Sequence, residues 1–151
     1  KVLERKPRIL ITGCPIGGVT EKVVKAIEDN GANVVFFENC MGAKAIEDLV
    51  SEEKEDVYEA LAEKYLSIGC SCMTPNDNRI KMLDRAIDEY KVDGVVDVIL
   101  QACHTYAIET LNIKRFVNGS KDIPYMSIET DYSTSDIGQL NTRMAAFVEM
   151  I

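Results

Sequence analysis

Four short apolar segments alternate with longer amphipathic segments along the whole chain, and this alternation constrains the fold more than any other feature. The apolar segments span residues 8–12, 33–37, 95–100 and 123–130, and they are rich in β-branched or aromatic residues. Strands that alternate with helices form a parallel sheet, because right-handed crossovers place the helices over its faces. We predict an α/β fold: a four-stranded parallel sheet with helices on both faces, flavodoxin-like.

The segments between the predicted strands have the spacing of amphipathic helices. At 151 residues the chain is long enough for one hydrophobic core, so we expect a single α/β domain over residues 1–151. Helices are predicted from Thr20 to Gly31, over an acidic stretch at about 44–67 whose charges form a solvated face, after Asn76 or Asp77, after Cys103, and over 138–151.

Charge and hydropathy exclude several classes of partner. The formal net charge of −8, without a basic stripe, disfavours nucleic acid and anionic membrane surfaces. No apolar run reaches the roughly 18 residues that span a bilayer, and the first eight residues lack the apolar centre of a signal peptide, so a cytoplasmic location is expected. The chain begins with Lys1 instead of Met, which fits a processed form or an excised piece.

Three cysteines stand where predicted strands end. Cys14 follows the first strand, Cys40 the second and Cys103 the third. Ligands of open parallel sheets bind beyond the carboxyl ends of the strands, so these thiols are expected to share one edge. Cys70 and Cys72 lie in a loop before a helix, and such loops rise from the same edge. Thiolates are soft ligands that suit iron–sulfur clusters or zinc, so all five cysteines could face one crevice.

Each of these residues also has a plain structural interpretation. Free cysteines often pack as small hydrophobes, which would suffice for Cys14 and Cys40. His104, the chain's one histidine, is either a hydrogen-bonded residue that orients Cys103 or a group that contacts substrate. The spacing of Cys70 and Cys72 is one residue tighter than the C-x-x-C of structural zinc sites, which disfavours zinc.

Two further segments have the composition of a site. Glu129 and Asp131, at the end of the fourth predicted strand, could transfer protons or fix a substrate hydroxyl. Equally, this segment could cap the next helix, through Asp131, Ser133, Ser135 or Asp136. The GCPIGG turn at 13–18 could bring backbone N–H groups to a phosphate, but it matches neither the dinucleotide fingerprint nor the phosphate loop. Glycines needed for a tight turn explain it as well.

Five motifs stand out along the chain: ITGCPIGG at 11–18, FENCMGAK at 37–44, YLSIGCSCMTPNDNR at 65–79, QACHTY at 101–106 and IETDYSTSDIGQLNTRMAAFVEM at 128–150. Together they resemble the motifs of one family, the iron–sulfur subunits of 2-hydroxyacyl-CoA dehydratases, with their relatives the benzoyl-CoA reductase subunits and double-cubane cluster proteins. This chain resembles the carboxyl-terminal lobe of such a subunit.

The resemblance implies an oxygen-sensitive cluster, a [4Fe-4S] cubane or a double cubane, held between two flavodoxin-like lobes. It implies Cys103 and Cys72 as cofactor-binding cysteines, and it leaves Cys14 and Cys40 either as further metal ligands or, like Cys70, as residues that pack or line the crevice. His104, Glu129 and Asp131 are the catalytic residues we expect in the same cavity.

The family's partners and reaction follow from the same resemblance. An ATP-hydrolysing activator supplies a strongly reducing electron, which the cluster passes to a 2-hydroxyacyl-CoA or, in the double-cubane branch, to a small molecule. The expected partners are an amino-terminal lobe, a second subunit, the activator and an acyl-CoA or small-molecule substrate. The chain would then be part of a carbon–oxygen lyase or a reductase, inactive as an isolated domain.

Two alternatives remain open at this stage. The chain could be a cluster-free α/β module that binds a CoA or phosphate ligand at the GCPIGG turn. It could also serve mainly to pair with another lobe or subunit, burying the cysteine edge in the interface.

Overall fold

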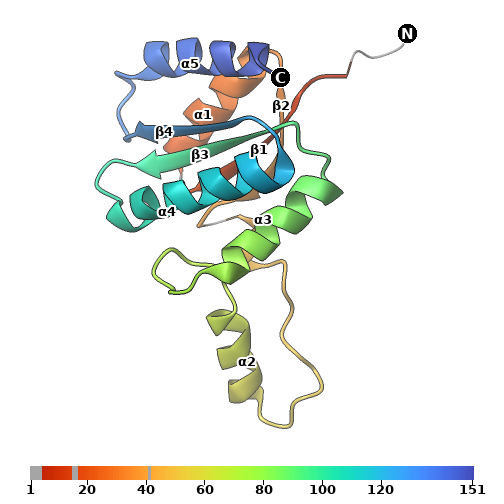
Figure 1. Ribbon diagram of the computed structural model, residues 1–151. Helices are drawn as coiled ribbons and strands as arrows, with labels where there is room; N and C mark the ends of the chain where they lie inside the picture. Colours follow the sequence, from red (N-terminus) through yellow and green to blue (C-terminus); the bar gives the residue numbers. More distant parts are fainter. Residues whose placement is uncertain (1–4, 15–16, 41) are drawn as a thin grey trace.

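The sheet has four strands, all parallel, in the order β2-β1-β3-β4 (Figure 1). The computed structural model describes residues 5–14, 17–40 and 42–151. The strands are β1 (Arg8–Gly13), β2 (Asn33–Glu38), β3 (Gly94–Leu100) and β4 (Tyr125–Thr130). Their bounds agree with the predicted strands to within two residues, so the sequence-based prediction of a parallel, flavodoxin-like α/β sheet is confirmed.

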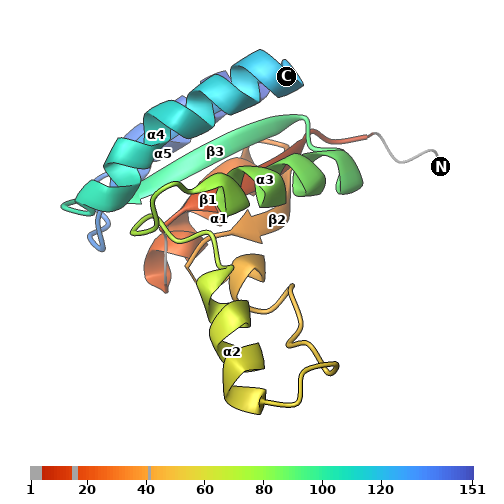
Figure 2. The same ribbon diagram turned by 60° about the horizontal axis from the view of Figure 1, so that its bottom comes forward.

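Helices cover both faces of the sheet, as predicted. One face carries α1 (Gly18–Asp29) and α5 (Ile137–Glu149), and the other carries α3 (Asp77–Glu89) and α4 (His104–Phe116), as Figure 1 shows. In Figure 2 the face with α3 and α4 is turned toward the viewer. Within the described part of the chain, each helix is too short or too polar to traverse a lipid bilayer. The remaining elements are η1 (Ala43–Ala45), α2 (Val57–Leu66) and η2 (Val117–Lys121).

Alternation of apolar side chains along the strands divides the core into two layers. Successive side chains of a strand point to opposite faces of the sheet. Ile9 and Ile11 of β1 therefore pack against α1 and α5, whereas Leu10 packs against α3 and α4. All three are fully buried. This double cover explains why the strands are nearly continuous apolar runs, and it leaves the strand ends as the accessible edge of the sheet.

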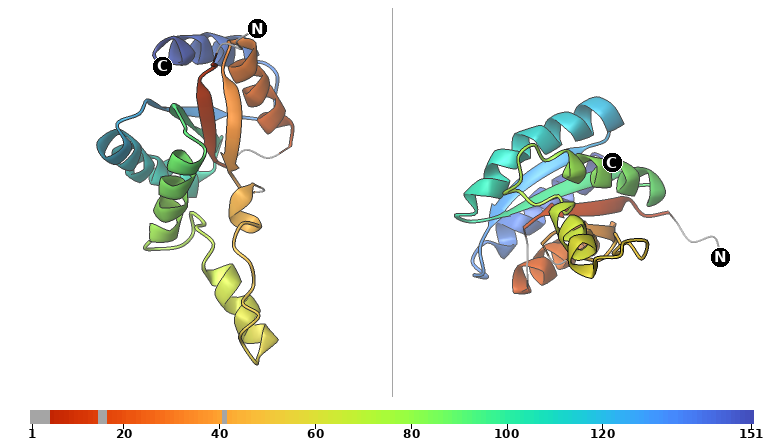
Figure 3. Two further views of the ribbon diagram at one scale, coloured as in Figure 1. Left: turned by 90° about the vertical axis from the view of Figure 1, so that its right-hand side faces the viewer. Right: turned by 90° about the horizontal axis from the view of Figure 1, so that it is seen from below.

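The acidic stretch at 44–67 differs from its prediction, because only η1 and α2 within it are helical. The helix begins at Val57, where the Asp56 side chain accepts a hydrogen bond from the Tyr58 backbone N–H at 2.8 Å. A short helix depends on burying an apolar face, and α2 buries Ala60 alone. Residues 46–66 form an arm that stands away from the α/β layer (Figure 3).

Candidate functional site

The cysteines that follow the strands meet at the carboxyl edge of the sheet. Helix α1 leaves β1 toward one face and α4 leaves β3 toward the other, so the connections diverge between these neighbouring strands, which is where open parallel sheets bind ligands. Cys14 directly follows β1, Cys40 follows β2 by two residues, and Cys103 lies just before α4. The predicted convergence of these three thiols on one edge is therefore what the topology produces.

Cys14 is buried at the base of this edge. Its side chain is 4% exposed and packs with Ile99 and Tyr106, and its sulfur accepts a hydrogen bond from the backbone N–H of Leu100 at 3.1 Å. Burial raises the pKa of the Cys14 thiol to about 12, and the neighbouring sulfur of Cys103 adds to the rise. Cys14 therefore packs as a small hydrophobic residue and also lies close to other thiols.

The backbone before Cys14 admits only glycine. Gly13 has a φ of +106°, and a Cβ at this position would lie 2.1 Å from the carbonyl oxygen of Val98 on the adjacent strand. The same carbonyl accepts the backbone N–H of Cys14 at 2.9 Å. Close contact between β1 and β3 therefore fixes where the Cys14 sulfur lies, which gives Gly13 of the GCPIGG turn a structural role.

Cys40 and Cys103 are more accessible than Cys14. Cys40 is exposed, and its sulfur lies 3.5 Å from the hydroxyl of Tyr106. Cys103 is half-buried against the small cluster around Cys14, 3.9 Å from the Thr105 hydroxyl. The charge of a thiolate at either position acts on Cys14 and raises its pKa, so the three sulfurs lie within electrostatic range of one another.

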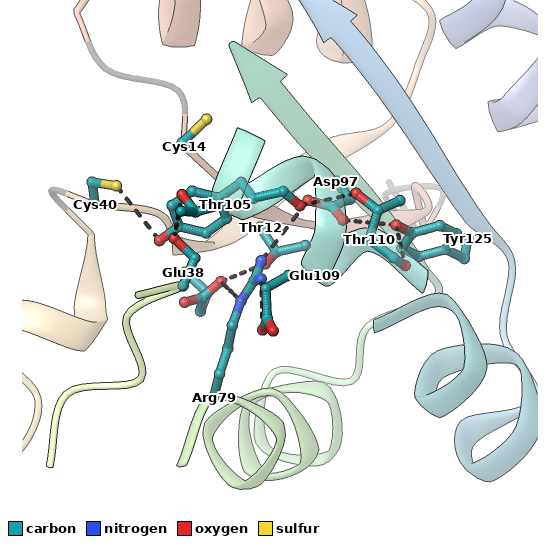
Figure 4. Close-up of polar contacts among 12 residues, drawn as sticks. Thr12, Cys14, Glu38, Cys40, Arg79, Asp97, Thr105, Glu109, Thr110 and Tyr125 are labelled. Atoms are coloured by element: carbon teal, nitrogen blue, oxygen red, sulfur yellow. Dashed lines mark hydrogen bonds and ion pairs between the residues drawn. The ribbon is translucent and has the colours of Figure 1, made fainter. Parts of the chain in front are cut away.

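A buried ionic network lies directly beneath the cysteines (Figure 4). The Arg79 guanidinium donates to the Thr12 hydroxyl at 2.8 Å and to a Glu38 carboxylate oxygen at 3.3 Å, and the Thr12 hydroxyl itself donates to Glu38. The Lys44 ammonium lies 3.0 Å from the other Glu38 oxygen. All four residues are at most 5% exposed, so the charges compensate one another out of water.

Tyr106 connects this network to Cys40. Lys44 donates a hydrogen bond to the Tyr106 hydroxyl, and the Lys44 and Arg79 cations lie 4.8 and 4.7 Å from its ring centroid. Burial raises the pKa of Tyr106 far above its ordinary range, so the hydroxyl keeps its proton. The Cys40 thiol also donates to the Tyr106 hydroxyl, at 3.5 Å, so the hydroxyl oxygen accepts from both Lys44 and Cys40.

Asp97 and Glu109 complete the charged cluster on the β3 side. Burial raises the pKa of the Asp97 carboxyl, which accepts a hydrogen bond from Tyr125 at 2.7 Å and lies 3.9 Å from Arg79. Glu109 lies 3.6 Å from Arg79. Burial lowers the pKa of Arg79, but the Glu38 and Asp97 carboxylates outweigh it and raise the pKa overall, so the guanidinium stays charged.

Cys70 and Cys72 form a separate pair on the loop before α3. Their sulfurs are 3.4 Å apart, and Ser71 between them hydrogen-bonds Thr105 at 3.0 Å, which ties the loop to the start of α4. A hydrogen bond from the Cys72 backbone N–H lowers the pKa of Cys70, whereas the shared interaction with the Cys70 sulfur raises the pKa of Cys72. The loop therefore approaches Cys103 through Thr105.

The predicted catalytic residues occupy different surroundings. His104 is exposed at the first position of α4. Glu129 and Asp131 line a cavity of about 160 Å³ with Gln101, at the end of β4. Hydrogen bonds from the side chain and the backbone N–H of Ser133 hold the pKa of the Asp131 carboxyl below its ordinary range. Of the four candidate caps, Asp136 stands at the cap position of α5.

The charged network is the part of the site that the sequence did not predict. Lys44 begins the acidic stretch that we expect to face solvent, and Glu38 directly follows the predicted strand 33–37. The one available signal is position: Thr12 and Asp97 lie in strands that are almost wholly buried, and Glu38 is the buried last residue of β2. A charged side chain in such a strand requires a compensating partner.

The donor set at the sheet edge fits an iron–sulfur cluster in its chemistry. Cys14, Cys40 and Cys103 offer soft sulfur ligands, and the Leu100 N–H that bonds Cys14 is the kind of donor that stabilises a ligating thiolate. Among residues 5–14, 17–40 and 42–151, no three Cys, His, Asp or Glu side chains are spaced to hold a single metal ion. A cluster spreads its ligands over several iron atoms and so needs wider spacing.

The fold and the site define a class: an α/β layer of the open parallel type that gathers thiols at the carboxyl ends of its strands. Comparison with known proteins makes this specific, because the model of the family "2-hydroxyglutaryl-CoA dehydratase, D-component" matches residues 1–151. The chain belongs to this family. It is a component of the dehydratase and reductase type, as the resemblance in its motifs implied.

Three curated relatives support this placement. The chain is 68% identical over 149 residues to "Putative dehydratase subunit YjiM" of Escherichia coli (strain K12), covering 99% of this chain and 39% of that protein. It is 24% identical to the alpha subunit of lactoyl-CoA dehydratase from Anaerotignum propionicum, over 71% of this chain and 26% of the relative. It is also 24% identical to a subunit of benzoyl-CoA reductase from Thauera aromatica, over 85% and 29%. The chain thus spans about two fifths or less of each relative.

Proposed function

We propose that this chain is the thiol-bearing lobe of a dehydratase or reductase component and that it binds an iron–sulfur cluster, a [4Fe-4S] cubane or a double cubane. Cys103, Cys14 and Cys40 are the proposed ligands from the strand ends, and Cys72 is a further ligand from the loop before α3. The observation that carries the proposal is the convergence of three strand-end cysteines at the switch point of the sheet, where ligands of such folds bind.

The chain's own residues would set the properties of this site. Held by these cysteines, a cluster would supply one-electron chemistry, with low-potential electrons from an ATP-hydrolysing activator and an acyl-CoA or a small molecule as acceptor. Ile99 and Tyr106 shield the Cys14 sulfur from water, and the Tyr106 hydroxyl is hydrogen-bonded to the Cys40 sulfur. Hydrogen bonds and an apolar shell of this kind tune the potential of a cluster.

Proton transfer at the substrate is assigned to residues around the crevice. His104, at the start of α4, adjoins Cys103 in the chain, and Glu129 and Asp131 lie at the next strand end. Loss of a hydroxyl group from a substrate requires an acid, and abstraction of a neighbouring proton requires a base. An exposed imidazole and two accessible carboxyl groups supply both roles.

The projecting arm supports an interface with a second polypeptide, either an amino-terminal lobe or another subunit. Large apolar side chains are more than half exposed on it: Ile46, Leu49, Val57, Tyr58, Tyr65 and Leu66. A group of exposed apolar side chains is typical of an interaction surface. The three relatives above are each named as subunits, which agrees with an assembly of several chains.

Anaerobic reconstitution of the full-length protein with iron and sulfide tests the proposal. We expect an absorption band and a spin-resonance signal typical of a cluster, and we expect Cys103→Ser to remove most of the bound iron. Cys70→Ser is the matched control, because Cys70 is not a proposed ligand, and it should keep the iron. Iron content unchanged in Cys103→Ser would remove Cys103 from the ligand set.

The same preparation discriminates the alternative, a cluster-free module for a CoA or phosphate ligand. Pro15 and Ile16 of the GCPIGG turn lie outside the described residues, so the structure does not describe that site as a whole. Calorimetric binding of an acyl-CoA by iron-free protein, abolished by a bulky residue at Gly18, would favour the module. Iron-dependent binding would favour the cluster.

A further inference from the structure

The Cys70–Cys72 pair has the geometry of a dithiol that can close. The two sulfurs already lie 3.4 Å apart, although the residues are separated by Ser71 alone. Cys72 is exposed and Cys70 is half-buried, so a small reagent can reach the first while the second lies behind it. An accessible thiol beside a second thiol is the arrangement through which thiol–disulfide exchange proceeds.

The loop holds the pair in place by contacts on both sides. The Met73 N–H donates to the Cys70 carbonyl at 2.9 Å, which closes a turn that brings the two side chains together. Ser71 is bonded to Thr105 of α4. Before the pair, a Cβ on Gly69 would lie 2.6 Å from the Arg79 backbone nitrogen, so the chain passes close against the start of α3. These contacts already restrict the conformational freedom of the loop in the dithiol form, so forming a disulfide costs less conformational entropy.

We propose that Cys70 and Cys72 form a redox-active dithiol that exchanges with low-molecular-weight disulfides of the glutathione type. The Cys72 thiolate attacks one sulfur of the disulfide and releases one glutathione thiolate. The Cys70 thiolate then attacks the Cys72 sulfur, forms the intramolecular disulfide and releases the second. The protein loses two electrons and two protons, and one glutathione disulfide becomes two glutathione molecules.

This inference rests on the loop geometry and does not depend on cluster binding. It has one consequence for the proposed function: a Cys72 sulfur in a disulfide is no longer available as a ligand. The strand-end cysteines differ from the pair, because Cys14 is buried and the Cys40 sulfur is hydrogen-bonded to a tyrosine hydroxyl. Exchange should therefore select the loop pair over the other thiols.

The test is an equilibrium titration of the iron-free protein in a glutathione redox buffer, with peptide mapping by mass spectrometry. Pre-organisation predicts that the ratio of Cys70–Cys72 disulfide to dithiol is at least about tenfold higher in the native protein than in the same protein unfolded in urea. The covalent ring is identical in both states, so the difference reports the native loop alone. A native ratio equal to or below the unfolded one would overturn the proposal.

Single variants separate exchange from other chemistry. Ser71→Ala keeps both cysteines but loses the hydrogen bond to Thr105, and it should lower the native ratio severalfold. Cys70→Ser should accumulate a stable glutathione adduct at Cys72, because the resolving thiol is absent. An adduct at Cys72 of the unsubstituted protein that never resolves to a disulfide would also contradict the proposal. Iron content after reconstitution is measured separately and reports on the cluster. Failure of the dithiol proposal can therefore be distinguished from failure of cluster binding.

Discussion

The two groups of cysteines in this chain differ in what holds them. Cys14 and Cys103 lie at the ends of β1 and β3, over a buried network of charges, whereas Cys70 and Cys72 lie on a loop held by a turn and one side-chain hydrogen bond. The first group is fixed by the sheet itself. The second is fixed locally and lies where solvent can reach it.

This difference separates two roles that the sequence presented as one. A ligand set for a cluster needs rigid thiols from distant parts of the chain, which strand ends supply. Reversible chemistry between two thiols needs neighbours that can approach further, which a short loop supplies. The comparison therefore requires a rigid sheet edge and a reactive loop.

The largest expected effect is the loss of the buried charge pairing under the sheet edge. Glu38→Gln leaves Arg79 and Lys44 without their shared carboxylate in a site that water does not reach. We expect the free energy of unfolding, measured with urea, to fall by about 3–5 kcal/mol. Glu59→Gln, which loses an exposed pair with Lys54, is the control and should cost far less, because water screens that pair. If both variants lost the same free energy of unfolding, the buried network would stabilise the fold no more than a surface ion pair does.

Backbone contact at the end of β1 should give the next largest effect. Gly13→Ala forces a Cβ against the Val98 carbonyl, at a φ of +106° that alanine rarely adopts. We expect a loss of about 2–3 kcal/mol in thermal or urea unfolding. Gly119→Ala is the matched control, because a Cβ there meets nothing within 4 Å. A tolerated Gly13→Ala would show that the sheet edge is not rigid.

Thiol reactivity should rank the cysteines by burial. Cys14 is 4% exposed with a pKa raised to about 12 by that burial, whereas Cys40 is exposed. At pH 8, alkylation of Cys14 by iodoacetamide should be at least about 100-fold slower than that of Cys40. Mass spectrometry of timed samples gives both rates in one experiment. Comparable rates would mean that the Cys14 site opens freely.

The smallest effect concerns β4, the edge strand whose end lacks a cysteine. Burial would raise the pKa of Asp136, but hydrogen bonds from Lys22 at 2.7 Å and Thr130 at 2.5 Å hold that pKa below its ordinary range. A lowered pKa means that this carboxylate stabilises the fold above about pH 4 and loses the contribution as pH falls through its folded-state pKa. We expect Lys22→Met to cost less than about 1 kcal/mol at pH 7 and less still at pH 3. A cost independent of pH would contradict the ion pair.

The sheet and the convergence of the strand-end cysteines could be predicted because both follow from periodicity. Continuous apolar strands such as Gly94–Leu100 identify a parallel sheet, and parallel strands place their carboxyl ends together. No side-chain distance is needed for that inference. The family resemblance rested on motifs at these same strand ends, and the match to the family model confirms it.

The buried charges and the arm could not be predicted, because they depend on tertiary contacts. Arg79 follows a polar run and Lys44 an exposed-looking turn, and only the folded chain brings both to Glu38. A helix-favouring composition over 44–67 does not make a helix where the layer offers no surface to pack against. The close contact of the Cys70 and Cys72 sulfurs is likewise a property of the loop's turn, which spacing alone does not reveal.

Thiol footprinting of the reconstituted protein tests the central claim most directly, because it asks whether thiols from separate strands act as one ligand set. Isotope-coded iodoacetamide would be applied to samples with and without the cluster. The account predicts that Cys40 and Cys103 lose reactivity together, each by at least about tenfold, when the cluster is present. A bound cluster that leaves both residues as reactive as in the iron-free protein would contradict it.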